Sequence, residues 1–252
     1  MPAFNERERI GPTLEAIAQY ATLHAVVLPI VVGDDGSQDA TGPHARDLAA
    51  QLGLDLELLV LPHRGKALTV RDAMLHAASR LHVDYLLMLD ADNEISIEHL
   101  GRVDWQADPT TIYIGRRVAT TDTSESFRPA PLRRMMSAGM RVASRLLLGM
   151  GHPDTQCGFK LFPRRLVAGL FGQQRSSGWI FDAEILTIAG RVSGLPIREV
   201  PVTWAPRGTS RVRATAAIPS LVSLVAVAVR LRTGSYRRIG VPVETVPGSP
   251  GA

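Results

Sequence analysis

An apolar run of strand length, residues 86–89, ends in three closely spaced carboxylates, Asp90, Asp92 and Glu94. Open α/β sheets usually bind their ligands at the carboxyl ends of the strands, so this run constrains both the fold and the position of a site. Carboxylates this close repel one another, and Mg²⁺ or Mn²⁺ suits oxygen ligands. A divalent cation is therefore a natural partner, although a solvated turn or a helix start also favours Asp and Asn.

Strand-like and helix-like patterns alternate around this run. Strands are predicted at 30–33, 56–61 and 84–89, and helices at 6–23, 39–52 and 65–81. Strands that alternate with helices of this length predict an α/β fold with a mostly parallel sheet covered on both faces. Polar residues follow each of the three strands, so we expect these residues to gather at one edge of the sheet.

The second half of the chain is less regular. It is predicted to contain a short strand at 112–115, a mobile loop at 119–131, an amphipathic helix at 132–148 and a further helix at 179–188. The tail from about residue 240 is rich in proline and glycine, and we expect it to be disordered.

The composition is that of a folded globular protein, with 45% hydrophobic and 21% charged residues in a chain of 252. A formal charge of +4 and a pI near 9.7 favour anionic partners. Nucleic acid is disfavoured, because the basic residues are dispersed and no recognition motif occurs. Cys157 is the only cysteine, so no disulfide can form within the chain, and a reducing compartment such as the cytoplasm fits.

One apolar segment, residues 214–229, bears on membrane association. Threonine, proline and two serines interrupt it, and it is shorter than the roughly 20 apolar residues that a membrane span needs. It follows a basic stretch at 204–213, and this combination suits a membrane surface or a lipid phosphate, with a solvated linker as the alternative. The first residues of the chain are polar, so no secretory signal is predicted.

Two polar segments at the predicted sheet edge have the composition of a nucleotide site. Asp34 and Asp35 lie in an acidic turn that could accept hydrogen bonds from a ribose, or that could cap the next helix. Residues 63–66 (His-Arg-Gly-Lys) connect a strand to a helix, where backbone N–H groups and basic side chains could face either a phosphate or solvent. This segment lacks the spacing of a P-loop.

Residues 154–160 place a carboxylate, an amide, a glycine and a lysine close together in the sequence. The lysine, Lys160, and Lys66 are the only lysines among 28 basic residues, and each lies in one of the polar motifs. A nucleophilic role for Cys157 is disfavoured, since no histidine lies beside it in the sequence.

Taken in order, these segments resemble glycosyltransferase family 2, and most closely its dolichyl-phosphate β-glucosyltransferase and dolichol-phosphate mannose synthase branches. The likeness covers residues 2–238. It rests on eight stretches in the family's order, at 2–6, 34–37, 64–66, 90–92, 115–117, 154–160, 181–184 and 204–211. The resemblance implies the GT-A fold, which is Rossmann-like.

The resemblance also implies roles for individual residues. The nucleotide sugar is expected to contact Pro2, Asn5, Glu6, Asp34, Asp35, Lys66 and Asp90. The implied metal ligands, for Mg²⁺ or Mn²⁺, are Asp92 as the principal one, with Asp90 and Glu94. The acceptor phosphate is expected to contact Arg117, Arg133, Ser137 and Arg207, and the implied catalytic residues are Asp92, Asp154 and Arg117. Between positioning the acceptor and acting as a base, the positioning role is favoured for Asp154.

The activity implied is metal-dependent, inverting transfer of a sugar, with glucose from UDP-glucose favoured, to a polyprenyl phosphate. The predicted division of the chain is a GT-A domain at 1–206, a basic amphipathic membrane-proximal segment at 207–239 and a disordered tail at 240–252. The protein would associate peripherally with the cytoplasmic face of a membrane. Two alternatives remain open: a soluble acceptor, and a non-catalytic relative that binds nucleotide or membrane.

The sequence departs from the family pattern in one place. The family's first strand is an apolar run immediately before the stretch that starts at Pro2, whereas here only Met1 precedes it. That strand normally lies in the middle of the nucleotide-binding sheet, so the fold is expected to lack it. Either the start of the protein lies further upstream or the donor site is damaged, and the family's amino-terminal membrane span is likewise not seen.

Overall fold

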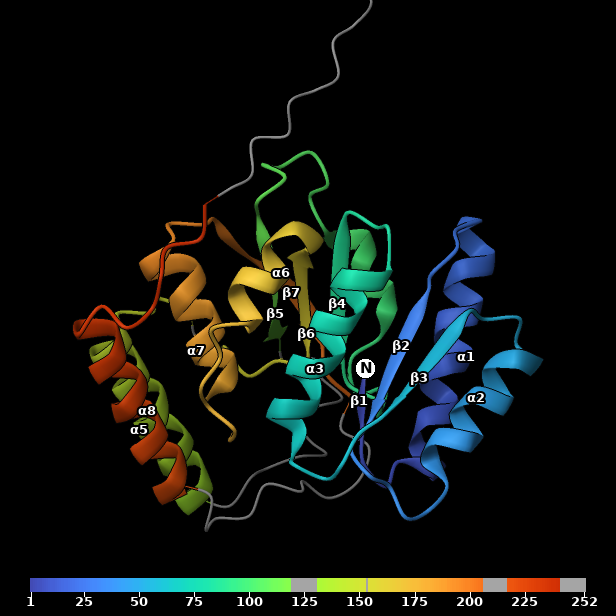
Figure 1. Ribbon diagram of the computed structural model, residues 1–252, viewed down its shortest axis with the longest axis horizontal. Coiled ribbons are helices and arrows are strands. Elements are labelled where there is room, and N and C mark those ends of the chain that lie inside the picture. The colour runs from blue at the N-terminus through green and yellow to red at the C-terminus, as the bar shows by residue number, and fades with distance from the viewer. Residues whose placement is uncertain (119–130, 153, 206–216, 241–252) are drawn as a thin grey trace, which may run out of the picture.

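The computed structural model of the chain describes residues 1–118, 131–152, 154–205 and 217–240, with only the backbone described at 131–137 and at 217. Two groups of strands lie between layers of helices (Figure 1). The strands are β1 (Pro2–Ala3), β2 (Ile30–Asp34), β3 (Leu56–Val60), β4 (Tyr85–Leu89), β5 (Ile112–Val118), β6 (Phe159–Pro163) and β7 (Ile197–Thr203). The α-helices are α1 (Arg7–His24), α2 (Thr41–Gln51), α3 (Lys66–Arg80), α5 (Pro131–Leu148), α6 (Arg164–Phe171), α7 (Phe181–Thr187) and α8 (Ala217–Arg232). A 3₁₀ helix, η1 (Ile97–Arg102), and a π-helical turn, η2 (Ile188–Val192), complete the described elements.

The strands form a three-stranded sheet in the order β1-β2-β3 and a four-stranded sheet in the order β4-β6-β5-β7. Neighbouring strands are parallel except at β6, which runs antiparallel to both β4 and β5. The predicted α/β fold with a mostly parallel sheet flanked by helices is therefore confirmed. The strand pattern alone did not predict the reversed direction of β6.

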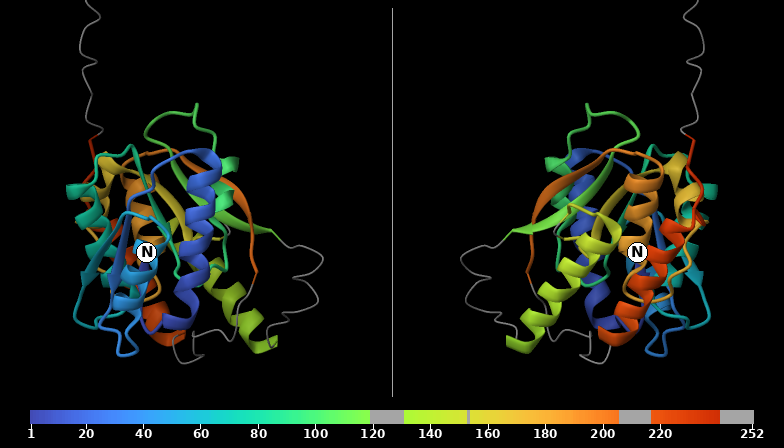
Figure 2. Two further views of the ribbon diagram at one scale, coloured as in Figure 1. Left: turned by 90° about the vertical axis from the view of Figure 1, so that its right-hand side faces the viewer. Right: turned by 90° about the vertical axis from the view of Figure 1, so that its left-hand side faces the viewer.

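Helix periodicity predicted the first half of the chain well. In α1 the side chains of Ile10, Leu14 and Ile17 are buried at helical spacing, and they pack in a core that also contains η1. A second core lies around α3, α6, α7 and α8 (Figure 2). The two cores cover opposite faces of the strands, as expected for a layered α/β fold.

The expected lack of the family's first strand, an apolar run before Pro2, stays a prediction. Pro2 and Ala3 themselves form a two-residue strand, β1, which pairs in parallel with β2 in the register Pro2–Gly33 and Ala3–Asp34. The Met1 amino group continues this ladder by donating a hydrogen bond to the Val31 carbonyl over 2.8 Å. Because β1 is so short, no described strand joins β2 to β4, and the two sheets remain separate.

Helices α5 and α8 lie side by side at one end of the molecule (Figure 1). The inner face of α8 contributes Leu224, Val227 and Ala228 to the core around α3. None of the helices in the described ranges has the length and apolar character that crossing a bilayer requires. The predicted boundary after residue 206, the loop at 119–130 and the tail at 241–252 all lie outside the described residues, so the division of the chain stays a prediction.

Candidate functional site

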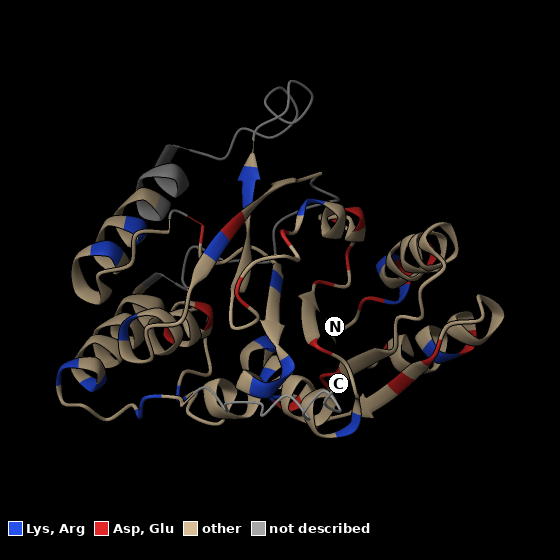
Figure 3. Cartoon of the chain, turned by 90° about the horizontal axis from the view of Figure 1, so that it is seen from above, with Lys and Arg blue, Asp and Glu red and all other residues tan. Residues whose placement is uncertain are grey.

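The predicted site residues meet at the carboxyl ends of the central strands. Asp90, Asp92, Glu94 and Arg117 line one small hollow of about 60 Å³, together with Gln156 and Trp204. Viewed from above, short acidic and basic stretches lie close together near the middle of the molecule (Figure 3). We call the group formed by Lys66, Asp90, Asp92, Glu94, Arg117 and Asp154 the charged edge.

Asp90 is held in an ion pair at the end of β4. The Lys66 ammonium, in the first turn of α3, lies 2.6 Å from Asp90 Oδ1. Burial alone would raise the pKa of Asp90, but Lys66, with help from Lys160, holds that pKa below its usual range. Gly158 permits this approach, since a Cβ at that position would clash with Asp90 Oδ2. Asp90 is thus an ionised carboxylate that the protein itself neutralises.

A second ion pair lies beneath the first. Lys160 and Asp182 are almost completely buried, and Lys160 Nζ lies 2.7 Å from Asp182 Oδ1. Burial raises the pKa of Asp182 although Lys160 opposes the shift. Since Asp182 also acts on the charge of Lys66, the two pairs form one cluster that contains both lysines of the chain.

Asp92 differs from Asp90 in its surroundings. Burial, followed by the negative charges of Asp90 and Glu94, raises the pKa of Asp92 above its usual range. No described basic residue forms a salt bridge with it, and its Oδ1 accepts only a 3.2 Å hydrogen bond from the Glu94 backbone. Asp92 is therefore the carboxylate of this group that would gain most from a bound cation.

Glu94 is tied to β7 through an aromatic residue. The Trp204 indole donates a hydrogen bond to Glu94 Oε2 over 2.7 Å, and the Glu94 carbonyl accepts one from Ala205. The indole ring also lies under the Arg117 guanidinium, 5.6 Å from ring centroid to Cζ. Trp204 thus links the acidic and basic sides of the hollow.

Arg117 and Asp154, both predicted as catalytic, form a bidentate pair. Arg117 Nε lies 2.7 Å from Asp154 Oδ2, and Arg117 Nη2 lies 2.8 Å from Oδ1. Both carboxylate oxygens of Asp154 are therefore engaged, so this residue is better placed to orient Arg117 than to accept a proton.

The predicted nucleoside-binding segments lie side by side and are bound to one another. Asp35 accepts hydrogen bonds from the backbones of Arg64 and Gly65, over 2.8 and 2.9 Å, and so orders the loop before α3.

The turn after β2 is held by Asp34 and Asn5. Asp34 accepts a hydrogen bond from the Ser37 backbone and packs against Gly42. Asn5 bonds to the same turn through Ser37 and Gln38, whereas Glu6 bonds to Thr41 and Arg9. Pro2 lies in β1 beside them.

The other three residues predicted to bind the acceptor phosphate lie on α5 and after β7. Arg133 and Ser137 lie on α5, but their side chains are outside the described part of the chain, and so is the whole of Arg207. Their predicted role in binding the acceptor phosphate stays a prediction. Burial raises the pKa of the Cys157 thiol to about 11, and such a shift disfavours the thiolate form that a nucleophile needs.

The three predicted metal ligands do not form a preassembled cage. Across the described ranges, no three His, Cys, Asp or Glu side chains converge closely enough to hold a metal ion. Asp90 is paired with Lys66, and Glu94 accepts from Trp204, so Asp92 is the main candidate ligand. This arrangement fits Mg²⁺, which commonly binds one or two carboxylates and completes its coordination with water and substrate phosphates.

Four important residues were not assigned roles from the sequence: Lys160, Asp182, Trp204 and Gly158. Each lies within a polar motif, but their partners are far away in the chain. One clue was available, since a lysine in a chain that otherwise uses arginine marks a position where a compact ammonium is required.

This geometry agrees with the comparisons to known proteins. The model of the family named glycosyl transferase family 2 matches residues 1–171. The chain belongs to glycosyl transferase family 2. The predicted family and the prediction that the chain is a glycosyltransferase are both confirmed.

Curated relatives match nearly the whole chain. Dolichyl-phosphate beta-glucosyltransferase ALG5C of Trichomonas vaginalis is 32% identical over 248 residues, which are 94% of this chain and 72% of that protein. Dolichyl-phosphate beta-glucosyltransferase of Saccharomyces cerevisiae is 28% identical over 256 residues, covering 94% and 75%.

Solved structures share the fold at lower identity. Glucosyl-3-phosphoglycerate synthase from Mycobacterium tuberculosis, crystallised with Mn²⁺, UDP-glucose and phosphoglyceric acid, aligns with a TM-score of 0.60 and 16% identity over 91% of this chain and 77% of that one. Mannosyl-3-phosphoglycerate synthase from Rubrobacter xylanophilus aligns with a TM-score of 0.56 and 16% identity, covering 99% and 76%. At this identity the likeness shows the fold alone.

Proposed function

We propose that the protein transfers glucose from UDP-glucose to a polyprenyl phosphate, with inversion at the anomeric carbon and with Mg²⁺ or Mn²⁺ as cofactor. Relatives named dolichyl-phosphate beta-glucosyltransferases support the sugar and the acceptor class. The structural neighbour crystallised with Mn²⁺ and UDP-glucose supports the donor and the ion.

The observation that carries the proposal is the composition of the hollow at the charged edge. Its acidic side consists of Asp90, Asp92 and Glu94, and its basic side is Arg117, fixed by Asp154. A transferase that joins a nucleoside diphosphate sugar to a phosphate needs both sides. The acidic side suits a cation-bound diphosphate, and the guanidinium suits the anionic acceptor.

Each residue has a physical task in this reaction. Asp92 would hold the divalent cation, which when bound neutralises the charge that develops on the leaving diphosphate. Arg117 would bind the acceptor phosphate and align it behind the anomeric carbon, and in-line attack from that side inverts the centre. The acceptor phosphate is already anionic near neutral pH, so no strong general base is required, and Asp154 serves to orient Arg117.

The surface of α5 and α8 supports attachment to a membrane. Ile218, Leu221, Val222, Val225 and Val229 lie along one outer face of α8, and Ile218 is 76% exposed. On α5, which lies beside α8 (Figure 2), Leu146 is also 76% exposed. Arg232, exposed in the last turn of α8, could contact anionic headgroups, whereas Arg230 lies 3.7 Å from the buried Glu184 carboxylate. We propose that this face lies on the cytoplasmic surface of a bilayer, and that the predicted segment 207–239 is membrane-proximal.

A transfer assay tests the proposal directly. Purified protein is given labelled UDP-glucose, UDP-galactose, GDP-glucose or GDP-mannose, with polyprenyl phosphate or 3-phosphoglycerate as acceptor, and with Mg²⁺, Mn²⁺ or EDTA. We expect metal-dependent transfer from UDP-glucose to the lipid phosphate. Activity only with the soluble acceptor would reject the proposed acceptor, and no transfer from any donor would reject the function.

The substitution Asp92→Ala gives the matching residue-level test. We expect transfer to fall by about a thousandfold, the size of effect seen when a group that stabilises transition-state charge is removed. The control is Asp47→Ala, because Asp47 is exposed on α2 and pairs only loosely with Arg46, over 3.6 Å. Equal turnover in the two variants would exclude Asp92 as the cation ligand.

A further inference from the structure

Three strand ends bring a pair of stacked rings beside a buried carboxylate. Phe4 follows β1, Asp35 follows β2 and His63 lies shortly after β3, and these strands are neighbours in one parallel sheet (Figure 1). The rings of Phe4 and His63 stack with their centroids 4.1 Å apart and an angle of 18° between their planes. Asp35 is 3% exposed, whereas the His63 side chain is 57% exposed. An exposed imidazole therefore lies against an aromatic ring and beside a carboxylate that solvent hardly reaches.

The imidazole meets Asp35 through one ring N–H group. His63 Nδ1 lies 2.8 Å from Asp35 Oδ2 and 3.1 Å from the Asp35 carbonyl oxygen. A carbonyl oxygen can only accept a hydrogen bond, so Nδ1 is the nitrogen that carries the hydrogen. Oδ2 also accepts from the Gly65 backbone. His63 and Gly65 together use both lone pairs of this oxygen, so a further donor can bond to it only by replacing one of them.

The imidazole is the donor that can leave without a change in the backbone. Arg64 and Gly65 donate to the carboxylate from the backbone of the loop. The backbone of His63 lies close to Gly36, where a Cβ would come within 3.1 Å of the His63 nitrogen. The ring itself is more than half exposed, and exposed side chains change rotamer within nanoseconds. Rotation about the His63 side-chain bonds therefore frees the stacking face and one lone pair of the carboxylate together.

The position that the imidazole would vacate has the chemistry of a base site. An aromatic stacking face with one hydrogen-bond acceptor beside it suits a planar heterocycle that has one ring N–H group. Uracil has one such group, N3–H. Guanine presents two adjacent donors, and the rings of adenine and cytosine carry no N–H in a nucleotide. The imidazole thus makes the two contacts that a uracil ring would make with Phe4 and Asp35.

We propose that the His63 imidazole occupies the base position of the donor site in the free protein, and that the uracil ring of the donor replaces it on Phe4 and Asp35. His63 then sets both the affinity and the base selectivity of the site. A base that restores the stack and the hydrogen bond compensates for the loss of the imidazole, whereas a base that restores only the stack does not. This inference rests on the proposed donor, a uridine diphosphate sugar.

Calorimetric titration of the full chain with UDP measures the competition. If the imidazole fills the base position in about 90% of the free molecules, the apparent dissociation constant of UDP is about tenfold higher than that of an open site. We therefore expect His63→Ala to bind UDP about tenfold more tightly than the unsubstituted chain, and added imidazole to weaken that binding. His82→Ala is the control, because His82 is an exposed histidine beyond the other end of α3, and it should leave the affinity unchanged.

The nucleotide 3-methyl-UDP, which lacks the N3–H group, tests the contact with Asp35. We expect it to bind roughly tenfold more weakly than UDP to the unsubstituted chain and to His63→Ala, since a buried carboxylate is left without a donor. Equal affinity for the two nucleotides would show that the base does not bond to Asp35, and the proposal would be overturned.

Proton NMR of the His63 ring distinguishes replacement from a base that stacks on the outer face of the imidazole. The ring current of Phe4 shifts the His63 ring protons upfield in the free protein, so departure from Phe4 should move these signals downfield when UDP binds. A base stacked on His63 would move them further upfield and would make His63→Ala bind UDP more weakly, and either result overturns the inference. Equal UDP affinity in the two proteins rejects this inference alone. Absence of UDP binding in both proteins rejects the proposed donor as well.

Discussion

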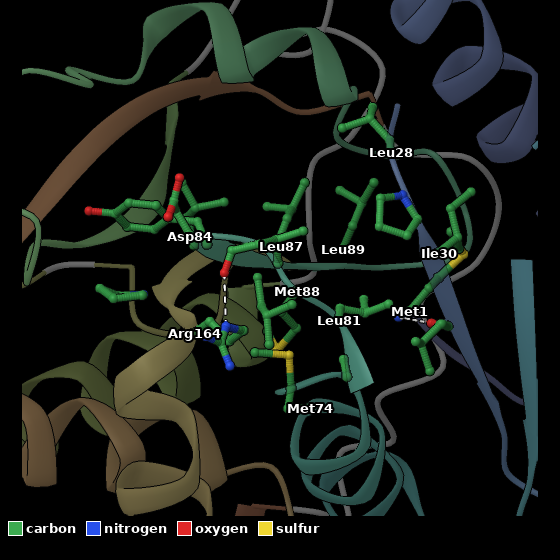
Figure 4. Close-up of a pocket in the computed structure, with 18 of the residues that line it drawn as sticks. Met1, Leu28, Ile30, Met74, Leu81, Asp84, Leu87, Met88, Leu89 and Arg164 are labelled. Carbon is green, nitrogen blue, oxygen red and sulfur yellow. Dashed lines mark hydrogen bonds between the residues drawn. The ribbon is translucent and has the colours of Figure 1, made fainter. Parts of the chain in front are cut away.

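The charged edge and a neighbouring apolar cavity of about 690 Å³ between β2 and β4, which we call the slot (Figure 4), differ in how their side chains are partnered. At the charged edge, Asp90 meets Lys66 and Asp154 meets Arg117, each within a single salt bridge. In the slot, the edges of β2 and β4 face each other across an apolar cavity. Polar groups at the charged edge are satisfied by individual partners, whereas side chains that line a cavity lose packing contacts on one side. A chemically organised site can therefore lie beside a loosely packed part of the core.

The largest effect on stability is expected at the buried pair under the charged edge. Lys160→Ala leaves the Asp182 carboxylate buried without its cation, and we expect the free energy of unfolding to fall by about 3 to 5 kcal/mol in urea titrations. Lys160→Met combined with Asp182→Leu should recover most of this loss, because it removes both charges. If Lys160→Ala left the free energy of unfolding unchanged, the stability of this region would not depend on specific ion pairs. The contrast drawn between the charged edge and the slot would then be wrong.

A pair of alanines compares the slot with a packed part of the core. Ala77 lines the slot, whereas Ala45 on α2 is fully buried and does not. Ala45→Leu should cost about 1 to 3 kcal/mol by overpacking, while Ala77→Leu should stabilise by about 1 kcal/mol by filling space. Thermal unfolding of the two variants measures the difference. Equal destabilisation would show that the slot has no room for added side chains.

The Met1 amino group should report on the slot through pH. Burial lowers its pKa from 8.0 to about 6. The unfolded chain therefore binds more protons than the folded chain between these values, so stability should rise by about 1 to 2 kcal/mol from pH 6 to pH 8. Amino-terminal acetylation should remove this dependence, since it removes the charge. If stability still rose from pH 6 to pH 8 after acetylation, the pH dependence would come from groups other than the Met1 amino group.

The smallest expected effect distinguishes two carboxylates of the charged edge. The pKa of Asp92 is raised, so its charge costs stability at neutral pH, and this cost vanishes as the pH falls through that pKa. Asp92→Asn should therefore raise the melting temperature by roughly 2 °C at pH 7 without added metal, and by less at lower pH. Asp90→Asn should lower it, because Lys66 loses its partner. If calorimetry showed a lower melting temperature for Asp92→Asn and a higher one for Asp90→Asn, the roles assigned to the two carboxylates would be wrong.

Local patterns predicted the elements whose residues follow a simple period. The spacing of Ile10, Leu14 and Ile17 was sufficient for α1, and the apolar run before Asp90 was sufficient for β4. In contrast, β6 and β7 were not predicted. β6 contains the buried Lys160 and ends in a proline, and β7 carries an arginine, a glutamate and Pro201, so neither has the composition of an ordinary strand.

The site was predicted in position but not in its pairings. Strand ends that lie together in a parallel sheet could be inferred from the pattern, and Lys66 and Asp90 do meet there. That Asp90 binds Lys66 or that Trp204 binds Glu94 could not be inferred, because residues 24 and 110 positions apart are brought together only by tertiary packing. Asp90 was predicted as a metal ligand, and its salt bridge with Lys66 likewise forms only through tertiary packing.

The scarcity of lysine has a practical consequence. The chain has three amines, of which Lys66 lies in the charged edge, the Met1 amino group lies at the slot, and Lys160 is 1% exposed. An amine-selective reagent therefore has two principal targets, one in each of the regions compared above. Protection of Lys66 by the donor could be followed by mass spectrometry on the unmutated sequence, with the Met1 amino group as the internal reference.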